Sequence, residues 1–91
     1  MRRQKKIRSL KIPYVRQQEI YVTCQRYALQ PQSVRERIEH ICDRVTDGDA
    51  HKRNALFLVL TSEKPIWRIA DEQYMAKTVL YELRKRFYEL W

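Results

Sequence analysis

Glycine is almost absent from this chain, which has one glycine and three prolines in 91 residues. Folds built from many short strands need numerous tight turns, and those turns depend on glycine and proline. The scarcity of both residues therefore argues against a β-rich fold and favours helices. With 44% hydrophobic residues and a length that suits one domain, the chain has enough apolar surface for a single modest core.

Cysteine and long apolar stretches are also scarce. The chain has two cysteines and no recognisable secretory leader, so we do not expect a framework of disulfides. Its longest apolar run covers only residues 55–60, far shorter than the roughly 20 residues that a membrane-spanning helix needs. We therefore expect a cytoplasmic protein with reduced thiols and no membrane partner.

Patterns typical of metal sites and active sites are missing as well. Four side chains offer soft metal ligands, and no C-x-x-C pair occurs among them: Cys24, His40, Cys42 and His51. His40 and Cys42 stand two residues apart in a helical segment, so they point in different directions. The sequence contains no evident nucleophile–base pair and no phosphate-binding loop. It predicts neither a metal nor a cofactor, and no enzyme activity.

Positive charge is what the chain has in excess. Its formal net charge of +8 favours an anionic partner such as nucleic acid. Residues 1–12 carry six basic and no acidic side chains, and such a segment cannot bury enough apolar surface to order itself. We predict a flexible basic arm over residues 1–12 that contacts phosphates or the minor groove; a merely solvated tail is the alternative. The contacting residues would be Arg2, Arg3, Lys5 and Lys6.

Hydrophobic spacing predicts helices throughout the rest of the chain. Apolar residues that recur three, four and seven positions apart place one face of a helix against a core. On this basis we expect helices over residues 17–29, 31–45, 50–61, 65–73 and 77–90. The run at 55–60 also fits a buried strand, because the periodicity of six apolar residues does not distinguish a helix from a strand. The polar residues before it favour a helix.

Capping signals support several of these boundaries. Pro31 suits the first turn of the second helix, and Ser33 with Glu36 forms an alternative start signal two residues later. Asp47 or Asp49 can cap the third helix. The sequence thus predicts a single all-α domain over residues 13–91, folded as a compact bundle of about five helices.

The last third of the chain, residues 65–91, meets the demands of a helix-turn-helix. Two helices that cross at a tight turn need a small residue at the crossing and an apolar residue in the turn, and Ala70 and Met75 supply them. The second helix would dock through an apolar stripe made of Leu80, Leu83, Phe87 and Leu90. At about 100° per residue, its opposite side holds Lys77, Thr78, Tyr81, Glu82 and Lys85, with Arg84 and Arg86 on the flanks. Side chains of these types read base edges in the major groove, and flanking cations contact phosphates.

The same residues resemble a known family. Ile69-Ala70, followed by Met75 and then Leu80, is similar to the I-A-x-x-x-x-V-S-x-x-x-V pattern of helix-turn-helix regulators. The string IADEQYMAKTVLYELRKRFYELW resembles the region-four-like domains of sigma factors and of small phage and mobile-element regulators. The resemblance covers about the last 27 residues. It implies sequence-specific DNA binding and transcription regulation through Lys77, Thr78, Tyr81, Glu82 and Lys85.

Two departures from the family pattern concern the turn. The family usually has glycine where Tyr74 stands, which implies a different or strained turn here. It usually has serine where Ala76 stands, which implies a recognition helix without its normal N-cap. Gln73 also replaces an apolar residue.

Two other classes of binding protein fit parts of the sequence. A basic arm suits RNA as well as DNA, although no RRM or KH signature is present. The aromatic residues at the C-terminus fit a protein-interaction module, in which Tyr88 and Trp91 contact a second copy of the chain or RNA polymerase.

Overall fold

The structure is a computed structural model that describes Ile7 and residues 10–91, and all regular elements in that part of the chain are helical. This confirms the predicted all-α class. The elements are α1 (Tyr14–Gln25), the short 3₁₀ helix η1 (Tyr27–Leu29), α2 (Gln32–Val45), α3 (Ala50–Thr61), α4 (Ile66–Glu72) and α5 (Lys77–Leu90).

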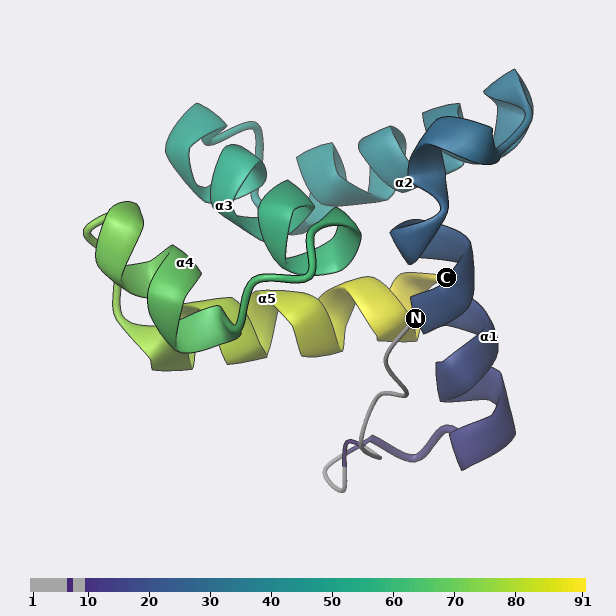
Figure 1. The fold of residues 1–91 in the computed structure, drawn as a ribbon, viewed down its shortest axis with the longest axis horizontal. Coiled ribbons are helices and arrows are strands. Elements are labelled where there is room, and N and C mark those ends of the chain that lie inside the picture. The colour runs from purple at the N-terminus through teal and green to yellow at the C-terminus, as the bar shows by residue number, and fades with distance from the viewer. Residues whose placement is uncertain (1–6, 8–9) are drawn as a thin grey trace.

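The helix α3 packs against all four of the other α-helices, and α5 packs against α2, α3 and α4. Figure 1 shows α5 running along one side of the molecule, with α4 at its N-terminal end and α1 near its C-terminal end. The radius of gyration is 12.2 Å, which matches the value of about 12 Å expected for a compact chain of this length. The predicted five-helix bundle is therefore confirmed.

Proline and aspartate set the helix starts. Pro31 and Pro65 stand at the N-cap positions of α2 and α4, neither with a side-chain capping bond. The alternative start at Ser33 is not used, because α2 begins one residue before it. At α3, the Asp49 carboxylate accepts a hydrogen bond of 3.0 Å from the backbone N–H of Lys52. This satisfies one of the four free N–H groups at the helix start.

The first helix begins and ends earlier than the spacing predicts. It starts at Tyr14, directly after Pro13, and stops at Gln25, after which residues 27–29 form a separate 3₁₀ turn. The Gln25 amide donates hydrogen bonds to the carbonyls of Leu60 (2.9 Å) and Ser62 (3.0 Å) at the end of α3. This contact ties the end of α1 to a segment 35 residues away, which no local pattern predicts.

The described part of the N-terminal segment is packed, whereas the sequence analysis placed it in a flexible arm. Leu10 is buried, and Ile7 and Ile12 lie against the core. The buried Gln17 side chain accepts a hydrogen bond from the Ile7 N–H (2.7 Å) and donates to the carbonyls of Ile7 (3.3 Å) and Ile12 (2.9 Å). Apolar side chains at positions 7, 10 and 12, overlooked among the basic ones, provide the burial that orders this segment. Residues 1–6, 8 and 9 lie outside the described residues.

At the C-terminus the buried face of α5 is wider than a simple stripe. Leu90, expected in the core, is 43% exposed, whereas Tyr88 is 2% exposed. Tyr88 lies about 100° around the helix from Phe87, and α5 is covered on more than one side because three helices pack against it.

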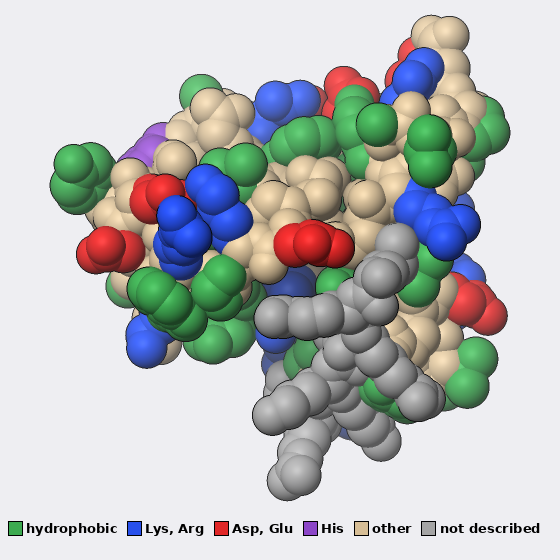
Figure 2. Space-filling view, viewed as in Figure 1, with side chains coloured by type: hydrophobic (Ala, Val, Ile, Leu, Met, Phe, Trp, Pro, Cys, Tyr) green, Lys and Arg blue, Asp and Glu red, His purple; other side chains and the backbone are tan. Residues whose placement is uncertain are grey.

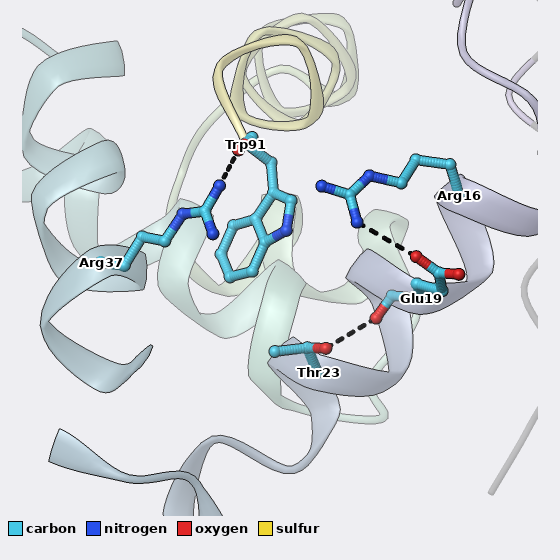
Figure 3. Close-up of polar contacts among 5 residues, drawn as sticks. All are labelled: Arg16, Glu19, Thr23, Arg37 and Trp91. Carbon is cyan, nitrogen blue, oxygen red and sulfur yellow. Dashed lines mark hydrogen bonds and ion pairs between the residues drawn. The ribbon is translucent and has the colours of Figure 1, made fainter. Parts of the chain in front are cut away.

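Trp91 also makes contacts within the chain. Its ring stacks near Phe87, with 5.8 Å between centroids, and the Arg37 guanidinium lies 4.2 Å from its centroid. Arg37 also donates a hydrogen bond to the Trp91 carbonyl. In Figure 3 the indole projects between Arg37 of α2 and the Arg16–Glu19 ion pair of α1. Tyr88 is thus buried within the chain, whereas Trp91 is half-buried, and a partner contact at these two residues stays a prediction.

Candidate nucleic-acid interface

The candidate interface is built on α4, α5 and the four residues between them. Ile69 and Ala70 of α4 are 0% and 3% exposed, and α4 packs on α5. Met75 in the connection is half-buried and also contacts the core. At this corner Ile69 and Ala70 are therefore buried, and Met75 is partly buried against the core.

The turn after α4 is closed by two backbone hydrogen bonds. The Met75 N–H donates to the Ala70 carbonyl at 2.9 Å, and the Tyr74 N–H donates to the Asp71 carbonyl at 3.3 Å. This pair of bonds defines a Schellman motif, whose residue in the left-handed conformation is usually glycine. Here that residue is Tyr74, with φ +54°. Of the two expectations raised by the missing glycine, a different turn or a strained one, the structure has the usual turn with a tyrosine in the left-handed position.

A side chain from α3 also contacts this turn. His51 Nε2 lies 2.6 Å from the Gln73 carbonyl oxygen, a distance typical of a hydrogen bond. The turn is thus fixed from α3 as well as from α4. No local pattern predicts this role of His51, because His51 and Gln73 are 22 positions apart and share no motif.

The start of α5 has no side-chain cap. Ala76 occupies the N-cap position, and its methyl group cannot accept a hydrogen bond. The absence of a side-chain cap, predicted from the missing serine, is confirmed. The first turn of α5, which contains Lys77 and Thr78, therefore has no side-chain hydrogen-bond acceptor at its N-cap.

Most of the side chains predicted to read DNA lie on the exposed side of α5. Lys77, Thr78, Tyr81 and Glu82 are exposed, whereas Leu80, Leu83 and Phe87 on the opposite side are buried. Arg86 on one flank is also exposed, but Lys85 and Arg84 are half-buried. The accessible polar surface is therefore concentrated in the first half of the helix.

Arg84 lies against Tyr81 instead of extending into solvent. Its guanidinium carbon is 5.4 Å from the centre of the Tyr81 ring, which is within the range of a cation–π contact. Burial lowers the pKa of the Arg84 guanidinium below its usual value. Within the described part of the chain its Nε atom has no hydrogen-bond acceptor. Arg84 thus supports one face of a ring that is 48% exposed.

The outer side of α4 carries mixed charges and an exposed aromatic ring. Lys64 and Arg68 both approach Glu72, at 3.0 Å and 3.8 Å, and Trp67 is 61% exposed. Figure 2 shows basic, acidic and hydrophobic side chains side by side over this end of the molecule. Because Glu72 offsets these cations, α4 does not present a field of one sign.

The largest share of the net charge lies outside the described residues. Arg2, Arg3, Lys5 and Lys6 are among them, as is Arg8, so five of the eight net positive charges belong to that part of the sequence and three to the described part. Long-range attraction for an anionic partner is therefore modest on the folded part alone.

Two further properties of the described residues concern other kinds of site. Within Ile7 and residues 10–91, no group of three His, Cys, Asp or Glu side chains is placed to hold a metal ion. None of the helices found there has both the length and the apolar character to cross a membrane.

Comparisons of the chain with protein-family models, curated proteins and solved structures find no match.

Proposed function

We propose that this chain binds duplex DNA in a sequence-specific manner and regulates transcription, with α4 and α5 acting as a helix-turn-helix. One observation carries the proposal: α5 buries Leu80, Leu83 and Phe87 while its opposite side exposes Lys77 and Glu82. A helix anchored on one side and polar on the other fits the major groove, which is about 12 Å wide.

The exposed residue types suit base recognition at the start of α5. A lysine donates hydrogen bonds to guanine, a glutamate accepts from the cytosine amino group, and a threonine methyl contacts the thymine methyl. Lys77, Thr78 and Glu82 provide these three chemistries within two turns of the helix. Tyr81, supported by Arg84, packs on a sugar or donates to a phosphate.

Affinity and sequence reading have different sources in this proposal. Arg2, Arg3, Lys5 and Lys6 neutralise phosphates and release counterions, which supplies affinity without sequence preference. Arg86 adds a phosphate contact on the flank, and Lys85 lies on the groove-facing side behind Glu82.

The first experiment is selection of bound sites from a pool of random duplexes. A recurring motif supports the proposal, and its symmetry reports whether one or two copies bind. Recovery of no motif, or equal binding of a structured RNA in competition, contradicts it. A co-purification with RNA polymerase on the selected site tests whether polymerase is a partner.

Matched glutamate variants test which part of α5 reads bases. Glu82→Ala removes a proposed cytosine contact, so the preference for the selected site over random duplex should shrink by about tenfold. Glu89→Ala removes the same charge about 10 Å further along the helix, so it should strengthen binding to both duplexes and leave the preference unchanged. Equal preferences in the two variants would contradict the assignment. Tyr81→Ala and Lys85→Ala should weaken binding to the selected site far more than they lower stability.

Salt dependence tests the N-terminal cations. Replacing Arg2, Arg3, Lys5 and Lys6 with glutamine leaves Ile7 and its contacts with Gln17 intact. The slope of the logarithm of affinity against the logarithm of salt concentration should fall in magnitude by up to about 3–4. An unchanged slope means that these residues form only a solvated tail.

A further inference from the structure

Tyr74 is an unusual residue type for the left-handed position that closes the turn between α4 and α5. Its φ of +54° lies in the left-handed region, which costs a residue with a Cβ atom more than it costs glycine. The other left-handed positions of the described chain are Asp47 and Gly48, residue types that tolerate this region well. Tyrosine is the unusual choice.

The Tyr74 side chain makes no packing contact with the described part of the protein. It is 94% exposed, and its ring has no contact with the core or with another described ring. The turn is held by backbone bonds and by His51, and none of these interactions involves the Tyr74 side chain. Glycine at this position would keep every observed contact and relieve the strain.

The position of Tyr74 indicates what the ring contacts instead. It lies three residues before Lys77, the first residue of α5, and so at the end of α5 that enters the groove in the proposed complex. Sugar-phosphate backbone borders the groove on both sides, and a tyrosine hydroxyl is a suitable donor to phosphate oxygen. Lys77 and the positive end of the α5 dipole, which no side chain caps, also favour an anion there.

We propose that Tyr74 is a DNA-backbone contact, which donates from its hydroxyl to a phosphate beside the major groove. This inference rests on the proposed function and adds a residue that reads no base. The strain at Tyr74 is therefore retained in exchange for an interaction with a partner, as is found at other binding sites with unusual backbone conformations.

Three variants of the full chain test this contact. Tyr74→Gly should raise the melting temperature by about 5 °C, because the left-handed strain is relieved. The same variant should bind duplex DNA about tenfold more weakly, because one phosphate hydrogen bond is lost. Tyr74→Asn tolerates the left-handed region without the flexibility of glycine, and it should bind as weakly as Tyr74→Gly. Tyr74→Phe should melt like the original protein but also lose affinity.

The pattern across duplexes separates this contact from base reading. A phosphate contact carries no sequence information, so the three variants should lose the same factor on the selected site and on random duplex, unlike Glu82→Ala. Unchanged binding by Tyr74→Gly with a higher melting temperature would overturn the contact, and a lower melting temperature would overturn the strain argument. If the original protein binds no duplex, both this inference and the proposed function fail. If the original protein binds duplex DNA and the Tyr74 variants bind it with the same affinity, the proposed function stands and the Tyr74 contact fails.

Discussion

The buried Gln17 side chain offers a sharp test of how the N-terminal segment is held. Gln17 is 1% exposed and makes three hydrogen bonds to the backbone of Ile7 and Ile12, at 2.7, 2.9 and 3.3 Å. Gln17→Leu keeps the size of the side chain and removes all three bonds. Each bond contributes about 1 kcal/mol net, and the longest contributes less. The half-buried Ile7 can partly rehydrate, so we expect a loss of about 2 kcal/mol in the free energy of unfolding.

Two measurements follow from this magnitude. The melting temperature should fall by about 10 °C, since 1 kcal/mol corresponds to roughly 4–8 °C in a domain of this size. Hydrogen exchange at the Ile7 amide should accelerate about 30-fold, because each factor of ten corresponds to about 1.4 kcal/mol. Both readouts are needed because a segment can open locally while the rest of the protein stays folded.

A control variant isolates the effect of burial. Gln32 donates from an exposed position to Glu36 at 2.9 Å, and water can replace that bond. Gln32→Leu should therefore change stability by less than about 0.5 kcal/mol. Equal stability of Gln17→Leu and the original chain, with unchanged exchange at Ile7, would refute the reasoning. Faster exchange with no change in melting temperature would show that Ile7 does not belong to the cooperative unit.

Three further predictions concern other parts of the fold. Asp49→Ala should lower the melting temperature by roughly 3–5 °C at pH 7. The hydrogen bond from the Lys52 backbone lowers the pKa of Asp49, so the stabilisation is present above the unfolded pKa of about 3.9 and is lost as pH falls through the lower folded pKa. An equal difference in melting temperature at pH 2.5 would contradict this assignment. Burial raises the pKa of the Cys24 and Cys42 thiols from 9.0 to about 12, so a thiol reagent at pH 8 should label them only after unfolding. Because the unfolded thiols ionise first, these two groups also reduce stability as pH rises above about 9. Tyr88→Ala should cost about 3 kcal/mol and the exposed Leu90→Ala about 0.5 kcal/mol in urea unfolding, and the reverse order would mean that the buried face of α5 is misplaced.

The helices that the sequence predicts best are those with a local start signal and a clear apolar pattern. The predicted bounds of α3, residues 50–61, agree with the structure because Asp49 caps the helix at its own position. The predicted start of α5 at Lys77 also agrees, since the residue before it ends a turn that contains the left-handed Tyr74. In both cases the information lies within a few residues of the boundary.

The features that the sequence does not predict depend on contacts between distant residues. The end of α1 is fixed by Gln25 against the end of α3, and the turn before α5 is fixed by His51. Gln17 reads as an ordinary polar residue of a helix, although it is buried and bonded to Ile7. Periodicity describes one helix at a time, and it therefore misses polar side chains whose partners come from elsewhere.

For the candidate interface, helical spacing predicted the exposed side of α5 at Lys77, Thr78, Tyr81 and Glu82 but not the partial burial of Lys85. A helical projection assumes one buried direction. In this fold three helices contact α5. The half-buried positions therefore extend further around the second half of α5 and include Lys85. The number of neighbours of a helix is a tertiary property that its own sequence does not state.

The helix α5 connects the interior of this protein to the candidate interface on its surface. One rod forms a wall of the core with Leu80 and Phe87 and carries the outward side chains on its other side. A helix of 14 residues is about 21 Å long, so a tilt of about 5° about one end would displace the other end by about 2 Å. A change of packing at Ile38, which is 0% exposed on the neighbouring helix α2, would therefore shift the candidate interface as a unit without altering any residue on its surface.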